Sequence, residues 1–127
     1  MSQGMIYAIV VLSVSFNAAA QLLLRIAMVD SNTASPQPQS LLSWVLALVS
    51  SPPLLGGLVL FGFSILAWLV VLSRLPVSIA YPMASLGYVV AALLGVIFLR
   101  EPVHFLQIVG IVVICLGVGL IARSAVP

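Results

Sequence analysis

Four apolar stretches, each long enough to cross a membrane as a helix, constrain this sequence most. They cover residues 5–28, 54–73, 77–99 and 103–122. A helix needs about 20 apolar residues to cross about 30 Å of hydrocarbon. Only 5% of the residues are charged, against about 25% in soluble domains. We therefore predict an all-α integral membrane protein, a four-transmembrane-helix bundle with one membrane domain over residues 1–127.

Residues 30–53 interrupt this pattern. The segment Asp30–Ser40 is rich in Ser, Pro and Gln and lacks apolar periodicity, which predicts a surface loop. Leu41–Val49 is apolar, but its nine residues rise only about 14 Å as a helix, which is too short to cross. We predict a short interfacial helix, capped by Ser40, with Trp44 at headgroup depth. An N-terminal extension of the next span is the alternative.

The charged residues are few and lie near the ends of the spans. A net charge of +2 without clustered Lys and Arg predicts no nucleic-acid partner. Arg74 and Arg123 fall on the side of the N-terminus, whereas Arg25 and Arg100 fall on the other. Because orientation follows the Lys and Arg count, this tie leaves the orientation open.

The sequence holds no pattern typical of catalysis or metal binding. We find no nucleophile with a matching base and no cluster of ligands at metal-binding spacing, so we expect no enzyme activity, no metal and no cofactor. Cys115 is the only cysteine, and we interpret it as a small buried hydrophobic residue.

A polar stripe follows the first span. Ser13, Asn17, Gln21 and Arg25 recur every four residues, a spacing that drifts only about 40° per step around a helix. In one interpretation, Asn17 and Gln21 join helices through hydrogen bonds of about 0.6 to 2 kcal/mol each. In the other, the stripe lines a path for a polar headgroup, and Arg25 binds a phosphate with two hydrogen bonds. A third interpretation is that Arg25 snorkels to the interface.

The third span carries a proline near its start. Pro82 removes a backbone hydrogen bond and frees a carbonyl, which predicts either a simple kink or a hinge beside a cavity. Tyr81 and Ser85 are four residues apart, so they share a helix face beside this break and offer two hydroxyl groups to a substrate.

Glu101 precedes Pro102 at the predicted start of the fourth span. A carboxylate at that position complements the helix dipole and can pair with Arg100 or His104. The alternative is a role for Glu101 in gating or proton coupling.

Small residues also recur at packing intervals in the last two spans. Such spacing lets helix backbones approach closely, so we expect a homodimer or a heterodimer with a similar small subunit. The residues are Gly87, Ala91 and Gly95 in the third span, and Gly110, Gly117 and Gly119 in the fourth.

The segment Leu75–Leu86, the Glu101-Pro102-Val103 triplet and the glycine-spaced last span resemble a known family. They are similar to the small-multidrug-resistance-like, EamA-type members of the drug/metabolite transporter superfamily. Within it, residues 72–122 most resemble the paired small subunits that flip aminoarabinose-phosphoundecaprenol across the bacterial inner membrane. Gln21 and Arg25 also match that pattern.

The chain departs from the multidrug exporters of the same superfamily. Those exporters carry a membrane-embedded Glu, where this sequence has Asn17, and a third-span Trp, where it has Ala84. An amide does not exchange protons and offers an organic cation no counter-charge. The resemblance therefore implies a neutral or anionic substrate.

Our leading hypothesis is a flippase for a polyprenyl-phosphate-linked sugar in the bacterial inner membrane. Its expected partners are the lipid-linked substrate, the membrane lipids and a second small subunit. An exporter of small polar or cationic compounds, with Glu101 as its candidate carboxylate, is the first alternative, and a non-transporting partner subunit is the second. The predicted substrate-binding residues are Asn17, Gln21, Arg25, Tyr81 and Ser85, and the predicted gating or coupling residues are Pro82 and Glu101.

Overall fold

The computed structural model describes residues 1–34 and 40–124, with side chains at 1–30 and 40–124. The secondary structure of these residues is helical, and the helices are α1 (Gln3–Ala34), α2 (Leu41–Val49), α3 (Pro52–Leu72), α4 (Val77–Met83), α5 (Leu86–Leu99) and α6 (Phe105–Ser124). The prediction of four spans is confirmed. The segments long and apolar enough to cross a membrane are Gln3–Asp30, Pro52–Leu72, Val77–Leu99 and Phe105–Ser124.

Helix α1 is longer than predicted. It ends at Ala34, so the first residues of the predicted Asp30–Ser40 loop are helical. The centre of that predicted loop, residues 35–39, lies outside the described residues. Polar residues such as Asp30 carry helix propensities only a few tenths of a kcal/mol below the average, so an established helix extends through them easily.

The short α2 is a helix of its own rather than an extension of α3. The Ser40 hydroxyl accepts a hydrogen bond from the Ser43 N–H at 3.2 Å, which confirms the predicted N-cap. Helix α3 then begins at Pro52, a residue suited to a first turn because its missing N–H needs no partner. The depth of Trp44 in a membrane stays a prediction.

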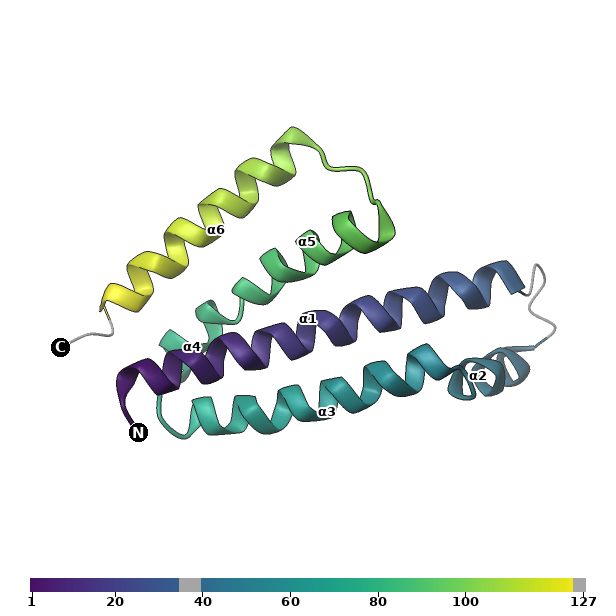
Figure 1. The fold of residues 1–127 in the computed structure, drawn as a ribbon, viewed down its shortest axis with the longest axis horizontal. Coiled ribbons are helices and arrows are strands. Elements are labelled where there is room, and N and C mark those ends of the chain that lie inside the picture. The colour runs from purple at the N-terminus through teal and green to yellow at the C-terminus, as the bar shows by residue number, and fades with distance from the viewer. Residues whose placement is uncertain (35–39, 125–127) are drawn as a thin grey trace.

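Helices α1 and α3 lie side by side and antiparallel, and they form the most closely packed pair (Figure 1). A Cβ at Gly57 would lie 3.0 Å from Leu24 Cδ2 and 3.2 Å from the Ala20 carbonyl oxygen. Ser13 and Ser64 are buried, and each hydroxyl donates to the other's carbonyl oxygen at 3.0 Å. A small residue and reciprocal hydrogen bonds therefore hold this pair, as is typical of membrane helices.

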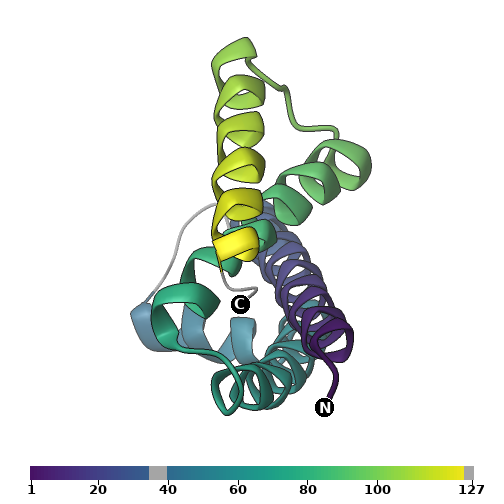
Figure 2. The ribbon, with the colours of Figure 1, turned by 90° about the vertical axis from the view of Figure 1, so that its left-hand side faces the viewer.

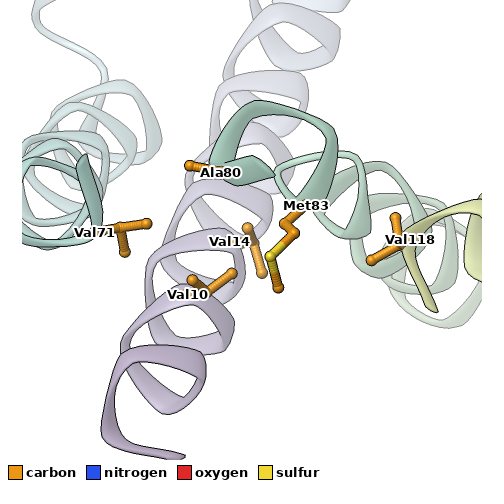
Figure 3. Close-up of a cluster of buried hydrophobic side chains, with 6 residues drawn as sticks. All are labelled: Val10, Val14, Val71, Ala80, Met83 and Val118. Atoms are coloured by element: carbon orange, nitrogen blue, oxygen red, sulfur yellow. The ribbon is translucent and has the colours of Figure 1, made fainter. Parts of the chain in front are cut away.

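The hydrophobic core lies at one end of the molecule, which we call the core end. There α1, the end of α3, α4 and the end of α6 converge, and the Tyr7 hydroxyl donates to the Ala122 carbonyl at 3.5 Å. Toward the opposite end, α5 and α6 diverge from the α1–α3 pair (Figures 1 and 2). We call this the splayed end. The buried core side chains, drawn in Figure 3, are Val10, Val14, Val71, Ala80, Met83 and Val118.

The third span is broken as predicted. Helix α4 contains Pro82 and ends at Met83, and α5 begins at Leu86. The linking residues form tighter bonds of the i to i−3 type, from Ser85 N–H to the Pro82 carbonyl and from Gly87 N–H to the Ala84 carbonyl. The Ser85 hydroxyl also donates to the Pro82 carbonyl at 2.6 Å. Whether this break acts as a gate stays a prediction.

Helix α6 corrects one expectation. Cys115 is exposed on its surface rather than buried, and Val118 is the buried residue of this helix. The expectation was wrong because an apolar sequence does not distinguish a helix face that packs on protein from one that faces lipid.

Candidate functional site

The polar stripe of α1 continues the helix face that packs into the core. Val10, Val14, Asn17, Gln21 and Arg25 are spaced by four, three, four and four residues, so they share one face. The exposed fraction of these side chains increases from Val10 to Arg25. The two valines are buried, Asn17 is half-buried, and Gln21 and Arg25 are exposed. The face is therefore covered at the core end and uncovered where α5 and α6 diverge.

Among the described residues, Ser13 is the member of the predicted stripe whose side chain donates a hydrogen bond to another span, to the Ser64 carbonyl of α3. Within the part of the chain that the structure describes, the side chains of Asn17 and Gln21 make no hydrogen bond. Polar groups at membrane depth need partners. The side-chain amides of Asn17 and Gln21 are therefore available to a substrate or to another subunit.

Arg25 pairs with Glu101 across the splayed end. Its Nε lies 3.4 Å from Glu101 Oε1, and the two side chains are 58% and 44% exposed. The sequence predicted Arg100 or His104 as the partner of Glu101, and this prediction is wrong. The true partner is 76 residues away in the chain, and the fold brings it close because α1 and α5 run alongside each other.

The backbone at the end of α5 positions Glu101. Arg100 adopts a left-handed conformation with φ of 51°, and the Glu101 N–H donates to the Gly95 carbonyl at 3.2 Å. The Arg100 N–H donates to the same Gly95 carbonyl, so this one oxygen accepts both bonds at the end of the helix. Glu101 therefore ends α5 and does not begin the fourth span, because α6 starts at Phe105.

Gly95 makes room for the Glu101 carboxylate, a role that was not predicted from the sequence. A Cβ at Gly95 would lie 2.8 Å from Glu101 Oε2, closer than real contacts allow. From the small-residue spacing, Gly95 was predicted to lie in a packing seam between helices. The available signal was the glycine six residues before Glu101 together with Pro102, since proline commonly follows a helix end.

Tyr81 and Ser85 lie apart from Arg25. Helices α1 and α4–α5 run in the same direction (Figure 1), and a Cβ at Gly87 would lie 3.7 Å from Val14 Cβ. Arg25 is eleven residues beyond Val14, or about 16 Å along the helix. The structure therefore distributes the predicted binding residues along the bundle and does not gather them in one pocket.

The face of α4 and α5 that carries Tyr81 is not the one that packs against the core. Tyr81 and Tyr88 are both 71% exposed, whereas Ala80 and Met83 are buried. An apolar depression of about 410 Å³ lies elsewhere, on the outer face of α3, and contains none of the predicted site residues. Its lining residues are Val59, Gly62, Phe63 and Leu66.

Residues 3–123 match the EamA-like transporter family. The chain is also similar to curated bacterial proteins named probable 4-amino-4-deoxy-L-arabinose-phosphoundecaprenol flippase subunits ArnE and ArnF. It is 40% identical over 75 residues to ArnE of Pseudomonas fluorescens, covering 59% of this chain and 66% of that protein. It is 39% identical over 72 residues to ArnE of Proteus mirabilis, covering 57% and 64%.

The similarity to ArnF is longer. The chain is 37% identical over 115 residues to ArnF of Erwinia tasmaniensis, covering 89% of this chain and 91% of that protein. The matches to the two ArnE proteins span just under two thirds of their lengths. No solved structure matches the chain.

Proposed function

Because the chain belongs to the EamA-like transporter family, we propose that it is a subunit of a flippase for a polyprenyl-phosphate-linked sugar. It is a multi-pass protein of the bacterial inner membrane. The observation that carries the proposal is the uncovered polar face of α1, in which Asn17 and Gln21 lack hydrogen-bond partners among the described residues and Arg25 lies at the exposed end.

In this proposal, the polyprenyl tail stays in lipid while the headgroup moves along the polar face. Asn17 and Gln21 supply hydrogen bonds at depths where hydrocarbon supplies none. Arg25 binds the phosphate, since a guanidinium matches two phosphate oxygens at once. Tyr81 and Ser85 act at the core end, where the headgroup enters or leaves, and movement at Pro82 changes its access.

The position of the carboxylates supports a lipid phosphate over an organic cation. Asp30 and Glu101 both lie near the splayed end, beyond Asn17 and Gln21 of the polar stripe. Asn17 occupies the place where the resembling exporters carry their Glu. A cation crossing the middle of this bundle would meet no counter-charge there from the described residues, which is costly in hydrocarbon.

The open face of α6 supports a partner subunit. Gly87 and Gly95 are used within the chain, because a Cβ there would meet Val14 and Glu101. A Cβ at Gly110 or Gly117 would meet nothing within 4 Å. We propose that a second copy or a similar small subunit packs on this glycine face, in keeping with the word subunit in the relatives' names.

Reconstitution in liposomes tests the transport proposal. Purified protein would be reconstituted with undecaprenyl-phosphate aminoarabinose, and headgroup accessibility would be measured on both leaflets. We expect the wild type and Arg123→Ala to move the headgroup across the bilayer. We expect Arg25→Ala to move none, although its thermal stability should be normal. Wild-type transport by Arg25→Ala would contradict the role of Arg25, and cation uptake without lipid crossing would contradict the proposal itself.

Cysteine cross-linking tests the partner proposal. In a Cys115→Ala background, Val113→Cys places a thiol beside Gly110 and Gly117, whereas Cys115 itself lies about 140° around the helix from Gly110. We expect membrane cross-linking at position 113 and much less at 115. Equal yields at both positions, or none at either, would contradict a glycine-face interface.

A further inference from the structure

The Arg25–Glu101 pair leaves hydrogen-bonding capacity unused on both partners. Arg25 contacts the carboxylate through Nε alone, although a guanidinium carries five N–H donors. Within the described residues, its terminal nitrogens make no hydrogen bond. Glu101 contacts Arg25 through Oε1 alone, although a carboxylate has about four acceptor positions. Each charge can therefore take a second partner without losing the first.

The Arg25–Glu101 ion pair is weak because it is exposed, but the fold fixes where the carboxylate lies. Both side chains are about half exposed, so the ion pair itself adds little stability. Its geometry is set instead by the fold. The left-handed Arg100, the bond from Glu101 N–H to the Gly95 carbonyl and the missing Cβ of Gly95 all hold the carboxylate beside Arg25.

We propose that Arg25 and Glu101 form a paired-charge site that selects a headgroup carrying both a phosphate and a protonated amine. The phosphate binds the free nitrogens of Arg25, and the ammonium binds the carboxylate of Glu101. This inference rests on the proposed flippase function and adds to it a specificity-determining residue, Glu101.

The selection follows from charge balance. A zwitterionic headgroup laid against the pair gives each of the four charges an opposite neighbour, with charge-assisted hydrogen bonds that are about twice as strong as neutral ones. A headgroup with the phosphate alone leaves Glu101 beside a second negative charge. Such repulsion rejects the wrong ligand as effectively as attraction selects the right one. Glu101 thus disfavours purely anionic lipids that Arg25 alone would accept.

The test compares two lipids that differ in one charge. Undecaprenyl-phosphate aminoarabinose and its N-acetyl derivative, which lacks the ammonium, would be offered to proteoliposomes, and their initial flipping rates measured. We expect the wild type to prefer the amine by about tenfold, as one partly exposed charge-assisted hydrogen bond implies. Glu101→Gln should reduce the ratio to about one. Asp30→Asn, a matched loss of a carboxylate at the same end, should keep it.

Gly95→Ala provides a second variant that leaves Glu101 intact. Its methyl group displaces the carboxylate from Arg25, so the preference should fall while the thermal unfolding temperature stays near that of the wild type. If the wild type flips both lipids equally, or Glu101→Gln keeps the preference, this inference is overturned while the flippase function stands. If the wild type flips neither lipid, the proposed function fails first.

Discussion

Adding one methyl group to α3 at Gly57 should weaken the α1–α3 pair, whereas the same change at Gly62 should not. In Gly57→Ala, the new Cβ would lie 3.0 Å from Leu24 Cδ2 and 3.2 Å from the Ala20 carbonyl oxygen. Leu24 can change rotamer, but the carbonyl belongs to the backbone, so α1 itself must move. Overpacking of this kind typically costs about 1 to 3 kcal/mol.

Gly62→Ala is the matched control, because a Cβ there meets nothing within 4 Å and lies in the same helix. Both changes gain the helix propensity of Ala over Gly, about 1 kcal/mol in water. Subtracting one variant from the other removes this shared gain and leaves the packing cost. We therefore expect Gly57→Ala to be less stable than Gly62→Ala by about 1 to 3 kcal/mol.

The free energies of unfolding would be measured by denaturant titration in mixed micelles, with helical circular dichroism as the readout. A second measurement is the rate at which a thiol reagent labels a cysteine introduced at the α1–α3 contact. Equal unfolding free energies for the two variants would refute the close approach of α1 and α3 at Gly57, and with it the packing described above.

The remaining predictions concern the same unfolding titration. Ser13→Ala and Ser64→Ala should each cost about 0.6 kcal/mol, and at most about 1.7. The double variant should lose about the sum, since each hydroxyl bonds a different carbonyl; a double variant no less stable than either single one would contradict the reciprocal pair. Arg100→Gly should stabilise the protein by up to about 1 kcal/mol, because Gly accepts the left-handed conformation freely, whereas Arg100→Ala should not.

The spans and the turns between the later spans could be predicted from the sequence, because the thickness of the hydrocarbon sets the length of a helix that crosses it. Each apolar run had to be about 20 residues, and Pro76 and Pro102 separate the later ones. The break at Pro82 was likewise local chemistry, since a missing N–H acts on the same turn. The cap at Ser40 belongs to the same class.

The candidate site was predicted less completely because it depends on distant contacts. The stripe on α1 followed from helical spacing, but nothing local shows that Arg25 meets Glu101 and not His104, with 76 residues between the first two. The glycines show the same limit. Gly95 and Gly117 look alike in sequence, yet Gly95 leaves room for the Glu101 carboxylate, whereas Gly117 faces open space.

Because the hydrophobic core lies at one end of the molecule, the predicted hinge between α4 and α5 lies far from Glu101. Helix α5 has 14 residues and is about 21 Å long, and Glu101 lies just beyond its far end. A rotation of α5 by about 10° at Ser85 would carry Glu101 sideways by about 4 Å over the length of the helix. That travel exceeds the 3.4 Å separation of the Arg25 Nε and Glu101 Oε1 atoms. If the predicted hinge at Pro82 moves, a change of one backbone dihedral there would make or break the Arg25–Glu101 contact at the far end of the span.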